Sequence, residues 1–122
     1  PHDRSQRMGT VRTATESQVD AALKAATEAA YGWDRLGGPA RAKILDNAAD
    51  LVERDRSKFM ALLVREAGRT IPNALAEVRE TADFLRYYAF QARKLFAEPV
   101  SLTSTTGETS TIEWRARGPF AC

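Results

Sequence analysis

TIPNALAEVRETADFLRYYAFQARKLF, residues 70–96, carries the longest amphipathic pattern in the chain. Its apolar side chains recur at alternating steps of three and four, which is the spacing of one buried face of an α-helix. The members of this row are Leu75, Val78, Ala82, Leu85, Ala89, Ala92 and Phe96. The segment therefore predicts a long helix that opens at Pro72 and buries this row in a core.

A second row climbs the same helix at the same spacing, and it consists of Glu77, Glu80, Phe84, Tyr87 and Gln91. Because it starts two residues after Leu75, it is rotated by roughly 200° around the helix axis. Two carboxylates followed by two aromatic rings differ from the Lys and Glu residues of an ordinary solvated face. We therefore expect a helix with a core on one side and a second, functional surface on the other.

Composition limits the classes of function. The 122 residues are 43% hydrophobic and 28% charged with a net charge of +2, which fits one soluble domain or part of one. The basic residues are interleaved with acidic ones, so we expect no nucleic-acid binding. No apolar run is long enough for a membrane span. The single cysteine, Cys122, and the single histidine, His2, leave no internal disulfide, Ser-His-Asp triad or histidine metal site, and a cytoplasmic location is predicted.

The rest of the chain predicts three further helices. Thr15 and Gln18 have the spacing of a capping box for the first helix, whose buried row would be Val19, Leu23, Ala26 and Ala30. Gly37-Gly38 would end that helix, and the second would follow in ARAKILDNAADLVERD, with Asp50 and Arg54 as an i,i+4 ion pair. The third would run from Ser57 to Ala67, burying Met60, Leu63, Val64 and Ala67, and would end at Gly68.

After Pro99 the pattern changes from helix to strand. Residues 109–117 alternate, with Ser110, Ile112, Trp114 and Ala116 on one side, and Val100 and Leu102 precede a turn near Thr106-Gly107. This predicts a β-hairpin, which is marginal alone and needs a partner strand from another subunit or from elsewhere in the same polypeptide. The expected fold is mainly α, with four helices and a C-terminal β-hairpin.

The expected organisation divides the chain into four parts. Residues 1–13 should be disordered or extended, 14–98 helical, 99–118 a β-hairpin, and 119–122 the start of a truncated buried strand. The chain lacks an initial Met and stops within the apolar run Phe120–Cys122. Domain boundaries usually fall in exposed linkers, so the sequence is expected to be a piece of a longer polypeptide.

From residue 14 onward the sequence resembles the start of an aldehyde dehydrogenase catalytic domain. The phrases LLVREAGRTIPNALAEVRE and DFLRYYAFQARKLF carry the resemblance, and TGE and RARGPFAC follow in family-like places. Within the superfamily the segment is most similar to the Δ1-pyrroline-5-carboxylate (L-glutamate γ-semialdehyde) dehydrogenases, above all to the dehydrogenase half of the bifunctional proline utilization A flavoenzymes. The fold implied is the N-terminal segment of an α/β aldehyde dehydrogenase.

The resemblance implies oxidation of an aldehyde through a cysteine nucleophile, with NAD as hydride acceptor and a glutamate base, in proline catabolism. All of these groups would lie beyond Cys122, which corresponds to a buried strand position and is expected to be structural. The segment alone should therefore be inactive. The similarity to the bifunctional enzymes also implies FAD in an upstream proline dehydrogenase domain, outside these residues.

One binding role is carried over by the resemblance. The long helix would line the substrate tunnel, with Glu80 facing the aldehyde and Phe84 one turn further along. The alternatives are that Glu77 and Glu80 are solvated or paired with Arg79 or Arg86, that Phe84 packs in the core, and that both tyrosines of the RYY motif, Tyr87 and Tyr88, are packing aromatics.

The family also implies that the hairpin is an oligomerisation flap that makes the protein a homo-oligomer. Two other readings of the chain remain open. One is a self-contained helical module for self-association, and the other is a different aldehyde dehydrogenase subfamily. A carboxylate at position 80 favours the semialdehyde branch because it suits a small charged substrate better than a fatty aldehyde.

Overall fold

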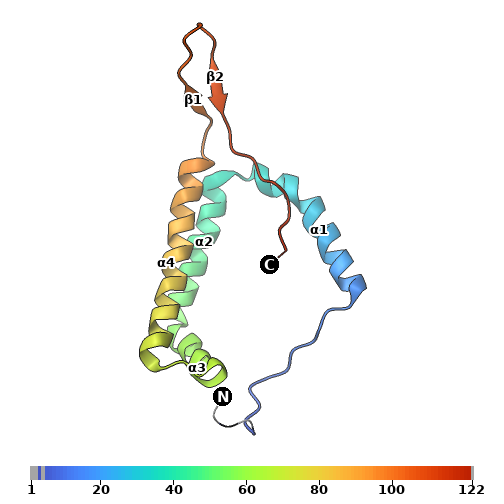
Figure 1. Ribbon diagram of the computed structural model, residues 1–122, viewed down its shortest axis with the longest axis vertical. Helices are drawn as coiled ribbons and strands as arrows, with labels where there is room; N and C mark the ends of the chain where they lie inside the picture. Colours follow the sequence, from blue (N-terminus) through green and yellow to red (C-terminus); the bar gives the residue numbers. More distant parts are fainter. Residues whose placement is uncertain (1–2, 4, 122) are drawn as a thin grey trace.

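The computed structural model describes residue 3 and residues 5–121, so His2 and Cys122 lie outside the described residues. Four helices and a two-stranded hairpin are present, as predicted. The long helix α4 (Ile71–Leu95) and the helix α2 (Gly37–Arg54) run side by side in opposite directions and share the broadest contact between elements (Figure 1). Within the described residues, none of the helices combines the length and apolar composition needed to cross a membrane.

The seam between α2 and α4 is built from small side chains. Its fully buried apolar residues are Ala42, Ala49, Ala74, Val78, Ala82 and Ala89. The predicted row on α4 is confirmed, because each of its members is buried or half-buried. Alanine lets two helix backbones approach closely, so the contact is broad but offers few interlocking side chains.

The two helices are in close backbone contact where α2 begins and α4 ends. Gly38 is buried, and a Cβ atom there would lie 2.2 Å from the carbonyl oxygen of Ala92. The Arg41 guanidinium lies over the ring of Phe96, 4.7 Å from its centre, and its Nε donates to the Gly37 carbonyl at 3.2 Å. This end of the helix pair is therefore held by close backbone packing at Gly38 and by the Arg41 side chain over Phe96.

The predicted pair between Asp50 and Arg54 is wrong. Asp50 instead accepts from Arg86 of α4 at 3.1 Å, while Arg54 donates to its neighbour Asp55 at 2.7 Å. Asp50 lies along the α2–α4 seam, where an arginine of the opposite helix is within reach. A contact between helices has replaced the local one.

Helix α3 (Arg56–Ala67) turns the chain from α2 back to α4. Gly68 ends it in the left-handed conformation with φ 69°, as expected for a helix-terminating glycine, and Thr70 caps α4 by accepting from the Asn73 amide. The predicted buried row is only half-buried, and Ala67 is exposed. The helix is short and lies at one end of the α2–α4 pair, so these two helices cover less of its surface than the pattern predicted.

Helix α1 (Glu16–Arg35) starts with the predicted capping box. The Gln18 amide donates to the Thr15 hydroxyl at 3.3 Å, and the Gln18 side chain accepts from the Thr15 amide at 3.0 Å. Its predicted buried row is wrong, however, since Val19 is 47% and Leu23 50% exposed. The helix leads away from the α2–α4 pair, and no described segment covers that part of it (Figure 1).

The hairpin projects beyond the end of α4 (Figure 1). Strands β1 (Val100–Leu102) and β2 (Ser110–Ile112) pair antiparallel with Val100 opposite Ile112, and Gly107 takes φ 84° in the connection. The prediction of a strand across 109–117 is wrong beyond Ile112. No described strand lies beside residues 113–117, so their alternating pattern is not matched by a hydrogen-bonded ladder.

Candidate functional site

The second face of α4 carries an open groove of about 600 Å³. All the residues that line it belong to α4, and they are Ala76, Arg79, Glu80, Asp83, Phe84 and Tyr87. The structure thus brings the two predicted binding residues, Glu80 and Phe84, together in one groove. Helix α4 thus forms one wall of the groove, where the Glu80 carboxylate lies next to the rings of Phe84 and Tyr87.

The Glu80 carboxylate is free for a ligand within the part of the chain that the structure describes. No cation of the described residues lies within ion-pair distance of it, and one of the two arginines considered as partners, Arg86, is bound to Asp50 and Glu53 instead. Ionic pairing therefore does not occupy the Glu80 side chain.

Glu77 forms an ion pair, but its partner is neither Arg79 nor Arg86, the two arginines considered. It is half-buried and forms an ion pair of 3.0 Å with Arg69. It lies outside the Glu80 groove and lines a separate hollow where α2, α3 and α4 meet. The two glutamates of the second row thus line different hollows, and only Glu80 shares the groove with Phe84.

The aromatic side chains of this face form a cluster. The rings of Phe84 and Tyr88 stack with centres 6.2 Å apart, and Tyr87 meets Tyr88 edge-on at 5.3 Å. Phe84 is 51% exposed, so it is not a core residue among the described residues. Stacked rings lose little conformational freedom on binding and provide a firm apolar wall. Chemically, the groove suits a small molecule with an apolar stem and a polar end that can meet a carboxylate.

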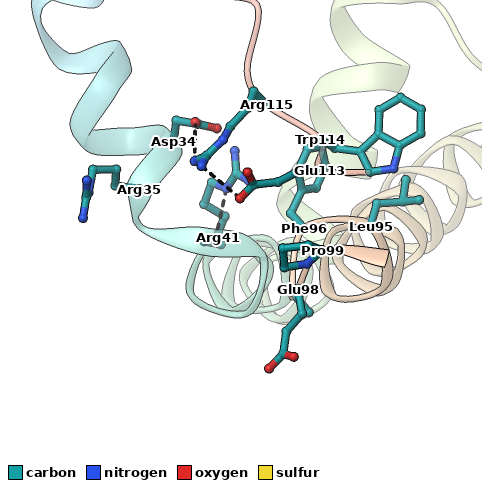
Figure 2. A pocket seen from close by; sticks show the side chains of 12 residues that line it. Asp34, Arg35, Arg41, Leu95, Phe96, Glu98, Pro99, Glu113, Trp114 and Arg115 are labelled. Atoms are coloured by element: carbon teal, nitrogen blue, oxygen red, sulfur yellow. Dashed lines mark hydrogen bonds and ion pairs between the residues drawn. The ribbon is translucent and has the colours of Figure 1, made fainter. Parts of the chain in front are cut away.

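A second cavity, of about 270 Å³, lies where α1, α2, α4 and the hairpin segment meet (Figure 2). Arg115 reaches both Asp34, at 3.6 Å, and Glu113, at 2.9 Å, and the Ala116 amide donates to Asp34 at 3.0 Å. Arg115 and the Ala116 amide therefore tie α1 to the segment after β2. No sequence pattern predicts this joint, because its partners are 82 positions apart.

Among the described residues, no group of three or more His, Cys, Asp or Glu side chains is arranged to hold a metal ion. The described residues also do not fit a dinucleotide. Gly37-Gly38 begins α2, but Gly38 is buried against α4 and its amide donates to the Phe96 carbonyl, so this helix start is closed to a phosphate.

Comparisons with known proteins agree with the fold and the motifs. The family model described as the aldehyde dehydrogenase family matches residues 1–122. The bifunctional protein PutA of Salmonella typhimurium is 49% identical over 89 residues, which are 73% of this chain and 7% of that protein. The 1-pyrroline-5-carboxylate dehydrogenase of a Geobacillus strain is 38% identical over 110 residues, 90% of this chain and 21% of that protein.

A solved structure points the same way. A crystal structure of bifunctional proline utilization A (PutA) superimposes with a TM-score of 0.86 at 42% identity, over 93% of this chain and 12% of that one. The chain therefore spans only a small part of the length of the relatives it matches. With the family model matched from end to end and the fold shared, this chain belongs to the aldehyde dehydrogenase family.

Proposed function

We propose that these residues are the N-terminal segment of an NAD-dependent L-glutamate γ-semialdehyde dehydrogenase, and that Glu80 and Phe84 line its substrate site. The observation that carries the proposal is the Glu80 carboxylate, free of ion pairs among the described residues and next to the exposed ring of Phe84 in one groove. The names of the relatives, PutA and 1-pyrroline-5-carboxylate dehydrogenase, support the same substrate.

In this proposal the chain supplies a wall of the site and not its reacting groups. The Phe84 ring would contact the carbon chain of the substrate, and Glu80 would face its aldehyde end, where it can accept a hydrogen bond from a hydroxyl of the hydrated aldehyde. NAD would bind residues outside this segment and would accept the hydride there. Any FAD would likewise belong to a separate proline dehydrogenase domain. The segment by itself is proposed to be inactive, and the protein cytoplasmic.

NADH formation by the full-length protein tests this proposal. The wild type should prefer glutamate semialdehyde to an aliphatic aldehyde such as hexanal. Glu80→Ala should lower kcat/KM for the semialdehyde by about tenfold or more, the usual scale for losing a hydrogen bond to a charged group. Phe84→Ala should act in the same direction. Glu28→Ala is the matched control, because Glu28 lies on α1, away from the groove.

The other outcomes distinguish the alternatives. Equal activity on hexanal with no effect of Glu80→Ala would keep the family but discard the semialdehyde branch and the site. No NADH from either aldehyde would favour a helical self-association module.

We also propose that the hairpin joins subunits of a homo-oligomer. The supporting observation is that Val100, Leu102 and Ile112 are 40–51% exposed and form a small sheet that has only two strands among the described residues. Sedimentation of the full-length protein tests this. Ile112→Lys should lower the mass, whereas Thr105→Lys in the exposed hairpin connection should not; an unchanged mass with Ile112→Lys would assign the strand's partner to the same chain.

A further inference from the structure

A row of ion pairs runs along the α2–α4 seam. Two arginines of α4, Arg86 and Arg93, face three carboxylates of α2, which are Asp46, Asp50 and Glu53. The carboxylates recur at i, i+4 and i+7 and therefore lie on one side of α2. Because the helices run antiparallel, Arg93 meets Asp46 near one end and Arg86 meets the other two further along.

Arg86 has the denser set of contacts. Its Nη2 donates to the Asp50 carboxylate at 3.1 Å and to the Glu53 carboxylate at 2.5 Å. The hydrogen bond with Glu53 raises the pKa of Arg86 above its ordinary value and lowers that of Glu53. One guanidinium thus fixes two side chains of the neighbouring helix one turn apart.

These contacts matter for geometry because the seam itself is smooth. It consists mostly of alanines, such as Ala49, Ala82 and Ala89, and small side chains resist rotation of one helix against another less than interlocking large ones do. An exposed ion pair contributes little to stability. Two directional contacts from one planar guanidinium can nevertheless set the rotation of α4 about its axis.

Rotation of α4 would move the candidate site directly. Glu80 and Phe84 are on the same helix as Arg86, and a side chain lies roughly 5–6 Å from the helix axis. A turn of about 20° would therefore shift the Glu80 carboxylate by about 2 Å. Misplacement of a substrate-positioning group by even 1 Å can cost about a hundredfold in rate.

We infer that Arg86 is a positioning residue for the aldehyde site, which holds Glu80 and Phe84 in place by bonding Asp50 and Glu53 of α2. The inference rests on the proposed function. Arg86 does not line the Glu80 groove, so it acts through the orientation of α4.

Kinetics of the full-length protein with glutamate semialdehyde test this, with active sites counted by titration of the reactive thiol. Arg86→Met should lower kcat per active site by about tenfold or more, because the site residues are displaced. Arg86→Lys should restore part of the loss, since it keeps the charge but not the planar geometry of the guanidinium. Arg65→Met is the control, as Arg65 is an exposed arginine of α3 outside the seam.

Thermal unfolding of the same variants separates positioning from stability. A purely structural Arg86 would lower the melting temperature and the number of active sites while leaving kcat per site and KM unchanged, and this result would overturn the inference. Asp50→Ala with Glu53→Ala removes both acceptors of Arg86; it should reproduce the loss of kcat, and it decides the question if Arg86→Met fails to fold.

Glu80→Ala in the same assay keeps the two proposals apart. If Glu80→Ala has no effect, the proposed site is wrong. If Glu80→Ala lowers kcat/KM while both the Arg86 variant and the double variant keep wild-type kinetics, the site stands and the positioning role fails.

Discussion

The main-chain amide of Gly38 donates a hydrogen bond of 3.1 Å to the carbonyl oxygen of Phe96. This bond joins the first turn of α2 to the residue that ends α4. The two helices that share the most extensive contact are thus tied backbone to backbone at one end. The contact requires the absence of a side chain at Gly38.

Gly38→Ala should destabilise the protein by about 1–3 kcal/mol, the usual cost of overpacking. A Cβ at this position would lie 2.2 Å from the Ala92 carbonyl oxygen, and that atom belongs to the backbone and cannot rotate away. Urea unfolding measures the effect. Gly32→Ala is the matched control: nothing lies within 4 Å of its added Cβ, and it should stabilise α1 by about 0.5–1 kcal/mol. Equal stability of the two variants would contradict the close packing at Gly38.

Thr15→Ala should weaken α1 by about 1 kcal/mol, because it removes the hydroxyl that accepts from the Gln18 amide. Hydrogen exchange of the first-turn amides of α1 measures this, and exchange should become faster. Thr27→Ala lies in the middle of the same helix, where the threonine hydroxyl bonds the Leu23 carbonyl. It should leave those amides unchanged or slow their exchange, since Ala has the higher helix propensity.

Gly68→Ala should cost about 1–2 kcal/mol, because Gly68 ends α3 at φ 69°, where a Cβ is strained. Gly68→Asn should cost less, since Asn tolerates the left-handed conformation. Thermal unfolding of the pair gives the comparison. If Ala and Asn proved equally stable at this position, the strain would not arise from the backbone angle.

The pKa of Asp55 should be about 2, below its ordinary 3.8, because its carboxylate accepts hydrogen bonds from Arg54 and Lys58. A depressed pKa means that these contacts stabilise the folded state above pH 3.8 and that this contribution is lost as the pH falls towards 2. Carboxyl-carbon NMR titration measures the pKa. Changing Arg54 and Lys58 to Gln should bring it back towards 3.8, and an unchanged midpoint would show that the two hydrogen bonds are not its cause.

The sequence predicted best where the interactions are local or repeat along one helix. The Thr15 capping box and the Gly68 helix end depend on neighbours within a few residues, and both are found. The buried row of α4 was predictable because its members face the same partner helix throughout. The open groove that holds Glu80 and Phe84 followed from the same helical spacing.

Contacts between residues far apart in the sequence could not be predicted from the hydrophobic pattern. Periodicity identifies an apolar face but does not tell whether another segment covers it, so Val19 and Leu23 were wrongly expected in a core. Asp50 had an arginine four residues away, yet it bonds Arg86 of another helix, 36 positions on. The joint at Asp34 and Ala116 joins residues whose proximity depends on the whole arrangement of α1, α4 and the hairpin.

Helix α1 has no buried residues, and its last turn is held by Asp34, which bonds the Ala116 amide 82 positions later. Helices α2, α3 and α4, by contrast, complete their contacts once Phe96 is available. During synthesis on the ribosome α1 emerges before α2, α3 and α4, but its contact with Ala116 can form only after all three have been made. The order in which these helices can complete their contacts therefore differs from the order in which they are made.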